Sequence, residues 1–146
     1  MFALNIWERQ IPVKAVYADC VEWVCKKYGI ARSELDILMF LANNPEYNTA
    51  ADIVEIKHMT KSHVSTSVQN LEKNGYITKY RSPGNQKTIH LSLCERSEEV
   101  INDGKKALEA FGEILFGGMT KEETAEFWRL VERMQKNMRE YLEVKK

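Results

Sequence analysis

Residues 60–93 read TKSHVSTSVQNLEKNGYITKYRSPGNQKTIHLSL, and the spacing of apolar residues changes within this segment. In its first half, Val64, Val68 and Leu71 recur at three- and four-residue steps. This spacing is typical of a helix with one buried face, which we expect to cover residues 60–75.

The second half of the segment follows a different period. Apolar and polar residues alternate over 76–81 and 88–93, on either side of a turn-rich tip at 82–87 that contains Pro and Gly. Alternation with a period of two is typical of a β-strand, and two such runs joined by a turn predict a hairpin. Residues 60–93 are therefore predicted to form a helix followed by a two-stranded β-hairpin.

Helices are predicted on both sides of this region. A Ser or Thr followed three residues later by Asp or Glu is a capping signal, and the pairs are Ser33 with Asp36, Thr49 with Asp52, and Thr120 with Glu123. With the apolar spacing and the Gly, Asn and Pro breaks, these signals predict helices over 12–28, 33–43, 49–56, 95–116 and 120–141. Residues 35–41 leave few polar positions, so that helix is expected to be buried on most sides. The predicted fold class is α+β, mostly helical.

The composition excludes several classes of protein. With 44% hydrophobic and 29% charged residues, the 146-residue chain is typical of a soluble globular protein. Its apolar runs are shorter than the roughly 18 residues that indicate a membrane-spanning helix, and residues 1–10 lack the features of a signal peptide. An odd number of cysteines, Cys20, Cys25 and Cys94, gives no disulfide framework. We expect a reducing, cytoplasmic location and no membrane partner.

Charge is unevenly distributed along the chain. The 21 Lys and Arg residues balance 21 Asp and Glu residues, which excludes a uniformly basic nucleic-acid-binding protein. Residues 57–94, however, contain six basic residues and one acidic residue, Glu72, and carry a net charge of +5, while the rest of the chain carries −5. All three histidines also lie in this segment. A segment with this charge attracts the phosphates of a nucleic acid.

Two short helices, a turn at 57–60 and a hairpin form the pattern of a winged helix-turn-helix. In this arrangement the second helix fits the major groove of DNA, and the hairpin contacts the backbone or the minor groove. A polar helix face alone is equally typical of an ordinary solvated surface, and the charge distribution favours DNA binding. The candidates for base or phosphate contact are Ser62, His63, Ser65, Thr66, Gln69 and Asn70, and the candidates for phosphate contact are Lys61, Lys73, Lys79, Arg81 and Lys87.

The stretch from Ile30 to Leu93 resembles the MarR (multiple-antibiotic-resistance regulator) family of bacterial transcription factors. The matching segments are SELDIL at 33–38, TAADI at 49–53, TKSHVS at 60–65, LEKNGYI at 71–77 and LSL at 91–93. The order and spacing of these segments carry the resemblance, rather than any single motif. The chain length and the flanking helices match as well, so the resemblance covers nearly the whole chain.

The resemblance implies a homodimer that represses or activates transcription at a palindromic operator in double-stranded DNA, with a small-molecule effector. It implies a winged helix-turn-helix DNA-binding region at 31–94 and a helical dimerisation region at 1–30 and 95–146. An apolar stripe on the last helix favours dimerisation over packing within the chain: Phe127, Trp128, Val131, Met134, Met138, Tyr141 and Leu142.

The sequence departs from the family pattern at positions that contact DNA. The hairpin tip, commonly Asp-Arg-Arg in the family, is Asn85-Gln86-Lys87 here, and the resemblance makes Asn85 and Gln86 candidates for DNA contact as well. Two positions often occupied by Arg in the recognition helix are Thr66 and Asn70. Lysine lacks the planar guanidinium group that suits a narrow minor groove. These differences predict weaker electrostatic affinity or a different operator.

Other kinds of site are less well supported. His58, His63 and His90 lack the ligand spacing of a zinc site, so neither a metal nor another cofactor is expected. The sequence shows no nucleophile–base arrangement and no phosphate-binding glycine loop, which argues against an enzyme.

Three further possibilities concern regulation and partners. Cys20 and Cys25 lie on the first helix, where some relatives carry a peroxide-sensing cysteine, so a thiol-redox-sensing regulator of the same fold is one alternative. A winged-helix protein-interaction module without DNA binding is another. Aromatic residues could line an effector pocket, although at helical spacing they more often belong to a core: Trp7, Tyr17, Trp23, Tyr28 and Phe40.

Overall fold

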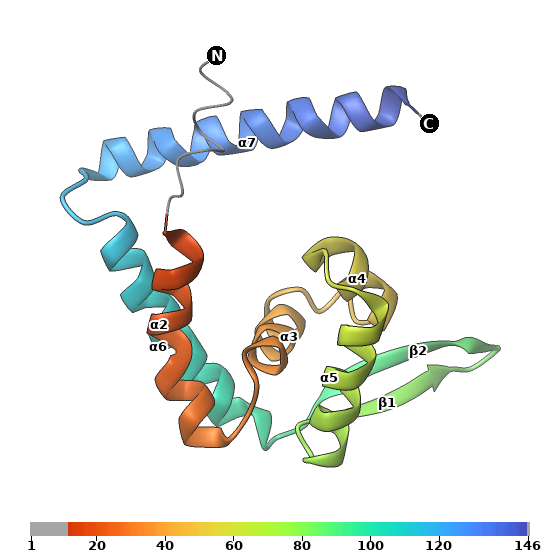
Figure 1. Cartoon of the computed structure of the whole chain (residues 1–146). Coiled ribbons are helices and arrows are strands. Elements are labelled where there is room, and N and C mark those ends of the chain that lie inside the picture. Colours follow the sequence, from red (N-terminus) through yellow and green to blue (C-terminus); the bar gives the residue numbers. More distant parts are fainter. Residues whose placement is uncertain (1–11, 146) are drawn as a thin grey trace. The chain divides into compact units, whose positions relative to one another are not determined.

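The computed structural model describes residues 12–145 and shows an α+β, mostly helical protein, which confirms the predicted fold class (Figure 1). Along the chain the elements are α2 (Val13–Tyr28), α3 (Arg32–Asn43), α4 (Ala50–Lys57), α5 (Lys61–Lys73), β1 (Ile77–Ser82), β2 (Asn85–Leu93), α6 (Ser97–Leu115) and α7 (Lys121–Val144). Within the described residues, no helix is long and apolar enough to cross a membrane. The chain divides into two compact units between Phe111 and Gly112.

Helix α3 forms the centre of the first unit. The side chains of Leu35, Ile37 and Leu38 are at most 1% exposed, because α2, α5 and β2 all pack against this helix. Apolar residues from the surrounding elements complete the core: Val24, Ile53, Val64, Leu71, Ile77 and Val100. The predicted burial of residues 35–41 on most sides is confirmed.

Side-chain caps begin two further helices as predicted. At the start of α4, Asp52 N donates to Thr49 Oγ1, and Thr49 N donates to Asp52 Oδ2. At the start of α7, Glu123 N donates to Thr120 Oγ1, and Thr120 N donates to Glu123 Oε2. Each pair satisfies two backbone N–H groups that the helix itself cannot satisfy.

The predicted cap of α3 by Ser33 and Asp36 is wrong. The N-cap residue is Ala31, and its N–H donates to Glu34 Oε2 at 3.2 Å. This contact is the carboxylate half of a capping box, and it needs no hydroxyl at the N-cap. Ser33 and Asp36 therefore lie inside the helix, where their side chains are available to contact other elements.

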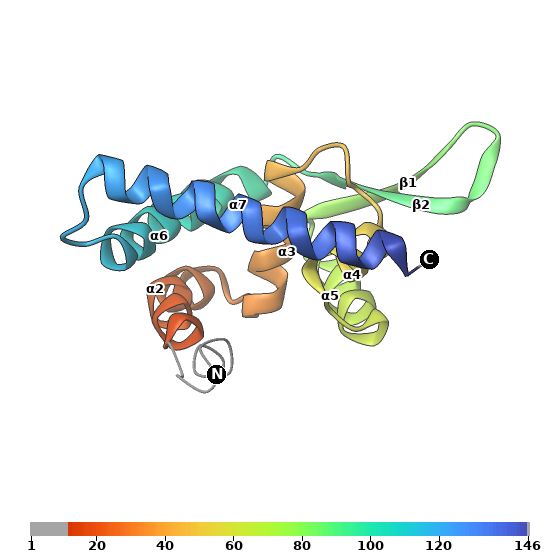
Figure 2. The ribbon, with the colours of Figure 1, turned by 90° about the horizontal axis from the view of Figure 1, so that it is seen from above.

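Strands β1 and β2 form an antiparallel hairpin in which Ile77 lies opposite Leu93. β1 is as long as predicted but shifted by one residue, and β2 begins three residues earlier than predicted, because the turn between the strands consists only of Pro83 and Gly84. Gly84 adopts a φ of +82°, which glycine accepts without strain. The hairpin extends away from α4 and α5, as Figure 2 shows from above.

Candidate nucleic-acid interface

Helices α4 and α5 and the turn between them form a helix-turn-helix (Figure 1). The turn begins at His58, which has a φ of +53° and is the one non-glycine residue with positive φ between residues 12 and 145. It ends at Thr60, whose Oγ1 accepts a hydrogen bond from His63 N at 3.1 Å. Thr60 therefore caps the helix predicted over residues 60–75, and this cap fixes the start of α5 directly after the turn.

Helix α5 has one buried face and one exposed face. Val64, Ser67, Val68 and Leu71 are buried against α3, α4 and β1. All of the residues of α5 that the sequence analysis proposes as DNA contacts are exposed: Lys61, Ser62, His63, Ser65, Thr66, Gln69, Asn70 and Lys73. Hydroxyl, amide, imidazole and ammonium groups on one accessible helix face are the groups that bind base edges and phosphates.

Two polar contacts hold α5 against α3. Asn70 Nδ2 donates to Glu34 Oε1 at 3.1 Å, and the hydroxyls of Ser33 and Ser67 are hydrogen-bonded at 3.1 Å. Glu34 is only 6% exposed, so this carboxylate is a buried part of the contact. The assignment of Asn70 to DNA contact stays a prediction, and its amide group already has a partner on α3.

This contact between α3 and α5 is not predicted by the residue spacing. One signal was present, because Ser67 falls on the same helix face as the buried Val64 and Leu71. A polar residue in such a stripe needs a hydrogen-bond partner when it is buried. The identity of the partner depends on how the two helices pack, which residue spacing within one helix does not reveal.

The hairpin contributes the other candidate cations. Lys79 on β1 pairs with Glu72 on α5, with 2.8 Å between Nζ and Oε2. This ion pair uses the one acidic residue of the basic segment, and it connects the hairpin to α5. Arg81, Gln86 and Lys87 are exposed near the hairpin tip.

Asn85 shapes the hairpin tip. Its Oδ1 accepts hydrogen bonds from the backbone N–H groups of Lys87 and Thr88, at 3.1 and 3.3 Å, and its Nδ2 donates to Thr88 Oγ1. These contacts employ both ends of the Asn85 amide within the turn, as is common for Asn in turns. Its DNA contact stays a prediction, and Gln86 and Lys87 are left as the freely exposed polar side chains of that trio.

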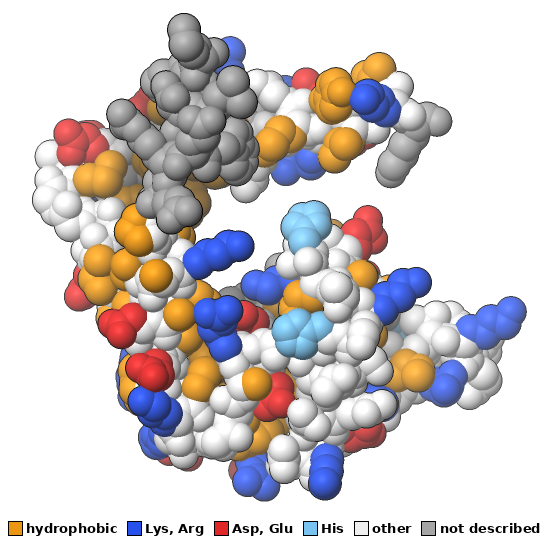
Figure 3. Space-filling model, in the orientation of Figure 1, with side chains coloured by type: hydrophobic (Ala, Val, Ile, Leu, Met, Phe, Trp, Pro, Cys, Tyr) orange, Lys and Arg blue, Asp and Glu red, His pale blue; other side chains and the backbone are white. Residues whose placement is uncertain are grey.

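Basic and histidine side chains are prominent over α4, α5 and the hairpin, and acidic side chains are few there (Figure 3). The view agrees with the net charge of +5 for residues 57–94. The first unit therefore presents one polar helix face next to a basic hairpin.

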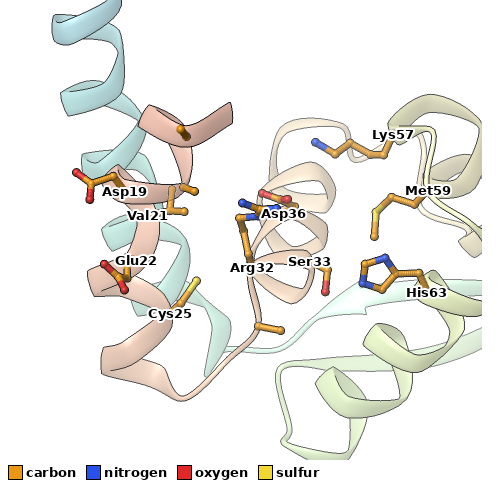
Figure 4. Close-up of a pocket in the computed structure, with 13 residues that line it drawn as sticks. Asp19, Val21, Glu22, Cys25, Arg32, Ser33, Asp36, Lys57, Met59 and His63 are labelled. Atoms are coloured by element: carbon orange, nitrogen blue, oxygen red, sulfur yellow. The ribbon is translucent and has the colours of Figure 1, made fainter. Parts of the chain in front are cut away.

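A hollow of about 830 Å³ lies between α2, α3 and the α4–α5 turn, and we call it the α2–α3 hollow. Figure 4 shows its lining, in which Arg32, Asp36, Lys57 and His63 provide polar groups. Tyr17 OH donates to Asp36 Oδ1. Burial and the Asp36 carboxylate raise the pKa of Tyr17, so its hydroxyl stays protonated as a donor.

The aromatic residues considered as a pocket lining lie elsewhere. Phe40 is buried in the core, Trp23 is exposed, and Tyr28 OH donates to Asp103 on α6. Tyr17 reaches the α2–α3 hollow only through Asp36, and Trp7 lies outside the described residues. The hollow is thus lined mainly by charged and small residues, and the predicted aromatic lining is absent from it within the described residues.

The cysteines are free thiols, and Cys25 lines the α2–α3 hollow. Burial, followed by the negative charge of Asp36, raises the pKa of the Cys25 thiol. A thiol whose pKa is raised reacts poorly, because the thiolate is the nucleophile. In the part of the chain that the structure describes, no three His, Cys, Asp or Glu side chains are grouped as metal ligands.

Residues 28–87 match the sequence model of the MarR family. No curated protein matches the chain. Among solved structures, the chain is similar to a MarR family transcriptional regulator from Listeria monocytogenes complexed with 26mer DNA, with a TM-score of 0.80 and 20% identity over 96% of this chain and 93% of that chain. It is also similar to a MarR transcriptional regulator from Methanosarcina mazei, with a TM-score of 0.78 and 20% identity over 94% and 91% of the two chains. A third similar structure is Staphylococcus aureus MarR in complex with salicylate and kanamycin, with a TM-score of 0.76 and 15% identity over 96% and 94%. At these identities, the structural similarity shows a shared fold.

Proposed function

We propose that this chain is a winged helix-turn-helix transcriptional regulator of the MarR family, whose sequence model matches residues 28–87, and that it binds a palindromic DNA operator as a homodimer. In each subunit α5 enters the major groove, and the hairpin contacts the flanking DNA. The observation that carries this proposal is the exposed polar face of α5, which Thr60 caps and Glu34 braces next to the basic hairpin. The solved Listeria relative is complexed with DNA, which supports the same use of the fold.

The apolar stripe of α7 supports the homodimer. None of the residues of this 24-residue helix is buried in the described chain. Met134, Met138, Tyr141 and Leu142 are each more than half exposed and recur at three- and four-residue steps. A long helix with an uncovered apolar stripe is stabilised by a partner surface, and a second copy of the same helix supplies one. The two subunits would then place their α5 helices about one turn of DNA apart.

We assign an effector to the α2–α3 hollow. Its lining joins α2 and α3 to Lys57, Met59 and His63, which belong to the helix-turn-helix. A molecule bound there would contact the start of α5 and so affect DNA binding. Its volume of about 830 Å³ is within the usual range for small-molecule sites, and one relative of this fold binds salicylate and kanamycin.

Selection of binding sites from random DNA with the purified full chain tests the proposal. The selected sequences should contain two inverted half-sites with centres about 10 base pairs apart. Titration of the selected DNA at several salt concentrations should give a steep log–log dependence. Lys87→Ala should reduce the magnitude of its slope by about one without changing the preferred sequence. Lys105→Ala, an exposed lysine on α6, is the matched control and should leave the slope unchanged.

Other outcomes would favour the other two functions. Failure to enrich any sequence, with no binding at low salt, would contradict the proposal and favour a winged-helix module that binds a protein. Loss of operator binding after peroxide treatment, with recovery under reductant, would favour a thiol-redox-sensing regulator. The raised pKa of Cys25 argues against such sensing at that residue.

A further inference from the structure

Three side chains join the loop before α4 to both strands of the hairpin, and we call them the Asn48 cluster: Asn48, Tyr80 and His90. The Oδ1 atom of Asn48 is hydrogen-bonded to Nδ1 of His90 on β2 at 2.7 Å. Its Nδ2 atom donates to the hydroxyl of Tyr80 on β1 at 3.2 Å. The rings of Tyr80 and His90 are stacked, with 5.2 Å between their centroids. One amide group therefore contacts both strands.

Backbone contacts connect the same loop to the hairpin and to the helix-turn-helix. Leu91 N donates to Asn48 O at 2.8 Å, and Thr49 forms an isolated β-bridge with His90. Thr49 is also the N-cap of α4, where its Oγ1 accepts a hydrogen bond from Asp52 N. The Asn48 cluster thus attaches the hairpin to the residue at which the helix-turn-helix begins.

A separate contact holds the other face of the hairpin. Lys79 on β1 pairs with Glu72 on α5, with 2.8 Å between Nζ and Oε2. Lys79 and Tyr80 are consecutive residues of one strand, so their side chains point to opposite faces of the hairpin. Since each face is held by a different element, a tilt of the hairpin towards or away from α5 would break one of the two contacts.

The Asn48 cluster lies where the hairpin becomes irregular. Tyr80 and His90 are opposite each other, and the register shifts between Tyr80 and Ser82. An irregularity of this kind is a place where a strand bends, and the hairpin extends away from α4 and α5 (Figure 2). Lys87 lies about 10 Å along the strand from His90, so a tilt of about 10° would move it by about 2 Å. Three proposed DNA contacts lie beyond the cluster: Arg81, Gln86 and Lys87.

We propose that Asn48 is a positioning residue, which fixes the angle of the hairpin against the helix-turn-helix before DNA is bound. The hairpin cations then meet the flanking DNA while α5 lies in the major groove, and Asn48 itself needs no contact with DNA. This consequence for DNA rests on the proposed function. The fixed angle does not, and it is measured without DNA.

Residual dipolar couplings of the ¹⁵N,²H-labelled full chain measure the hairpin angle. In wild type, the amides of β1 and β2 should fit the same alignment tensor as those of α4 and α5. Asn48→Ala should give the hairpin a separate, smaller tensor, because no side chain then holds the face that carries Tyr80 and His90. Asn43→Ala, at an exposed asparagine at the end of α3, is the matched control and should keep one tensor. One common tensor in Asn48→Ala would overturn the proposal.

The consequence for DNA is measured with two duplexes that carry the site selected above. The short duplex ends at the half-sites, and the long duplex adds about one helical turn on each side. Wild type should bind the long duplex more tightly, because the hairpins contact the added phosphates. Asn48→Ala should reduce this ratio of Kd values by at least about three-fold, since a net hydrogen bond shifts an equilibrium about two- to ten-fold. It should leave the Kd of the short duplex unchanged, and Asn43→Ala should leave both unchanged.

A general loss of structure gives a different result, because it would weaken binding to both duplexes equally. Equal losses on the two duplexes, or an unchanged ratio, would overturn the positioning of the hairpin on DNA by Asn48. If wild type selects no DNA, the proposed function fails, and the dipolar couplings alone decide whether Asn48 fixes the hairpin angle.

A second variant tests whether Asn48 acts through His90. His90→Phe keeps a ring next to Tyr80 and removes the nitrogen that Asn48 contacts. Because both changes break the same contact, the double variant should reduce the ratio little further than Asn48→Ala alone. Losses that multiply in the double variant would overturn the action of Asn48 through His90.

Discussion

The contact between Glu34 and Asn70 predicts an energetic coupling between α3 and the DNA-reading helix. Glu34 is 6% exposed and accepts two hydrogen bonds, from Ala31 N at 3.2 Å and from Asn70 Nδ2 at 3.1 Å. Hydrogen bonds to charged groups contribute about 1.5–3 kcal/mol each. Glu34→Ala also removes the cost of desolvating the buried carboxylate, and this gain offsets part of the loss of the two hydrogen bonds. We therefore expect Glu34→Ala to lower the free energy of unfolding by about 2–3 kcal/mol.

A double-mutant cycle isolates the share of this loss in unfolding free energy that comes from the hydrogen bond between Glu34 and Asn70. Asn70→Ala removes one of the two hydrogen bonds, so its coupling with Glu34→Ala should be about 1–1.5 kcal/mol. Near the melting temperature, this corresponds to about 2–6 °C for a chain of this size. The assay is thermal or urea unfolding followed by circular dichroism, at one fixed protein concentration because a dimer's stability depends on concentration.

Gln69 provides the matched control for this cycle. Gln69 is an exposed amide at the position of α5 next to Asn70. Within residues 12–145, its side chain makes no hydrogen bond to α3, whereas that of Asn70 does. The coupling of Gln69→Ala with Glu34→Ala should be close to zero. Equal coupling for Gln69 and Asn70, or coupling below about 0.3 kcal/mol for Asn70, would refute the bracing of α5 by Glu34.

Three further predictions concern the turn, the cap and a buried carboxylate. His58→Gly should stabilise the chain by about 0.5–1 kcal/mol in urea unfolding, because His58 adopts a left-handed φ of +53°, and Lys57→Gly, one residue earlier in α4, should destabilise it. Thr60→Ala should cost about 1 kcal/mol by removing the cap of α5, and unchanged stability would show that the cap is replaceable. Hydrogen bonds from Lys27 and then Tyr28 hold the pKa of Asp103 well below its usual range. Its stabilising effect is therefore present above about pH 4 and lost as the pH falls further, so wild type and Asp103→Asn should differ in stability at pH 7 and converge in acid; a constant difference down to about pH 2 would contradict this.

Much of the fold follows from spacing within single segments. The caps at Thr49, Thr60 and Thr120 were predictable because each depends on residues three positions apart. The cap of α3 was not, because Ser33–Asp36 and Ala31–Glu34 have the same spacing and packing decides between them. In the structure Ser33 contacts Ser67 and Asp36 contacts Tyr17, so both polar groups are used by neighbouring elements.

The candidate site was predictable to a similar extent. The sequence identifies which residues of α5 are polar and which segment is basic, and the structure places all of these α5 residues on an exposed face. The sequence does not reveal that the Asn85 side chain is hydrogen-bonded inside the hairpin tip or that Lys79 is paired with Glu72. Both contacts depend on how the hairpin folds and packs, and both reduce the number of side chains that are free to bind DNA.

The position of the α2–α3 hollow predicts how a ligand bound there would regulate DNA binding. The hollow includes His63 and leaves Lys61, Ser65 and Gln69 accessible. A ligand in it would change DNA affinity while DNA remains bound, so the apparent Kd for DNA would reach a plateau at saturating ligand. A ligand that covered the exposed face of α5 would instead exclude DNA, and the apparent Kd would rise linearly without a plateau. The shape of one titration curve therefore tests the assignment of an effector to this hollow, and Ala15→Phe, at an exposed alanine of its lining, should abolish the effect.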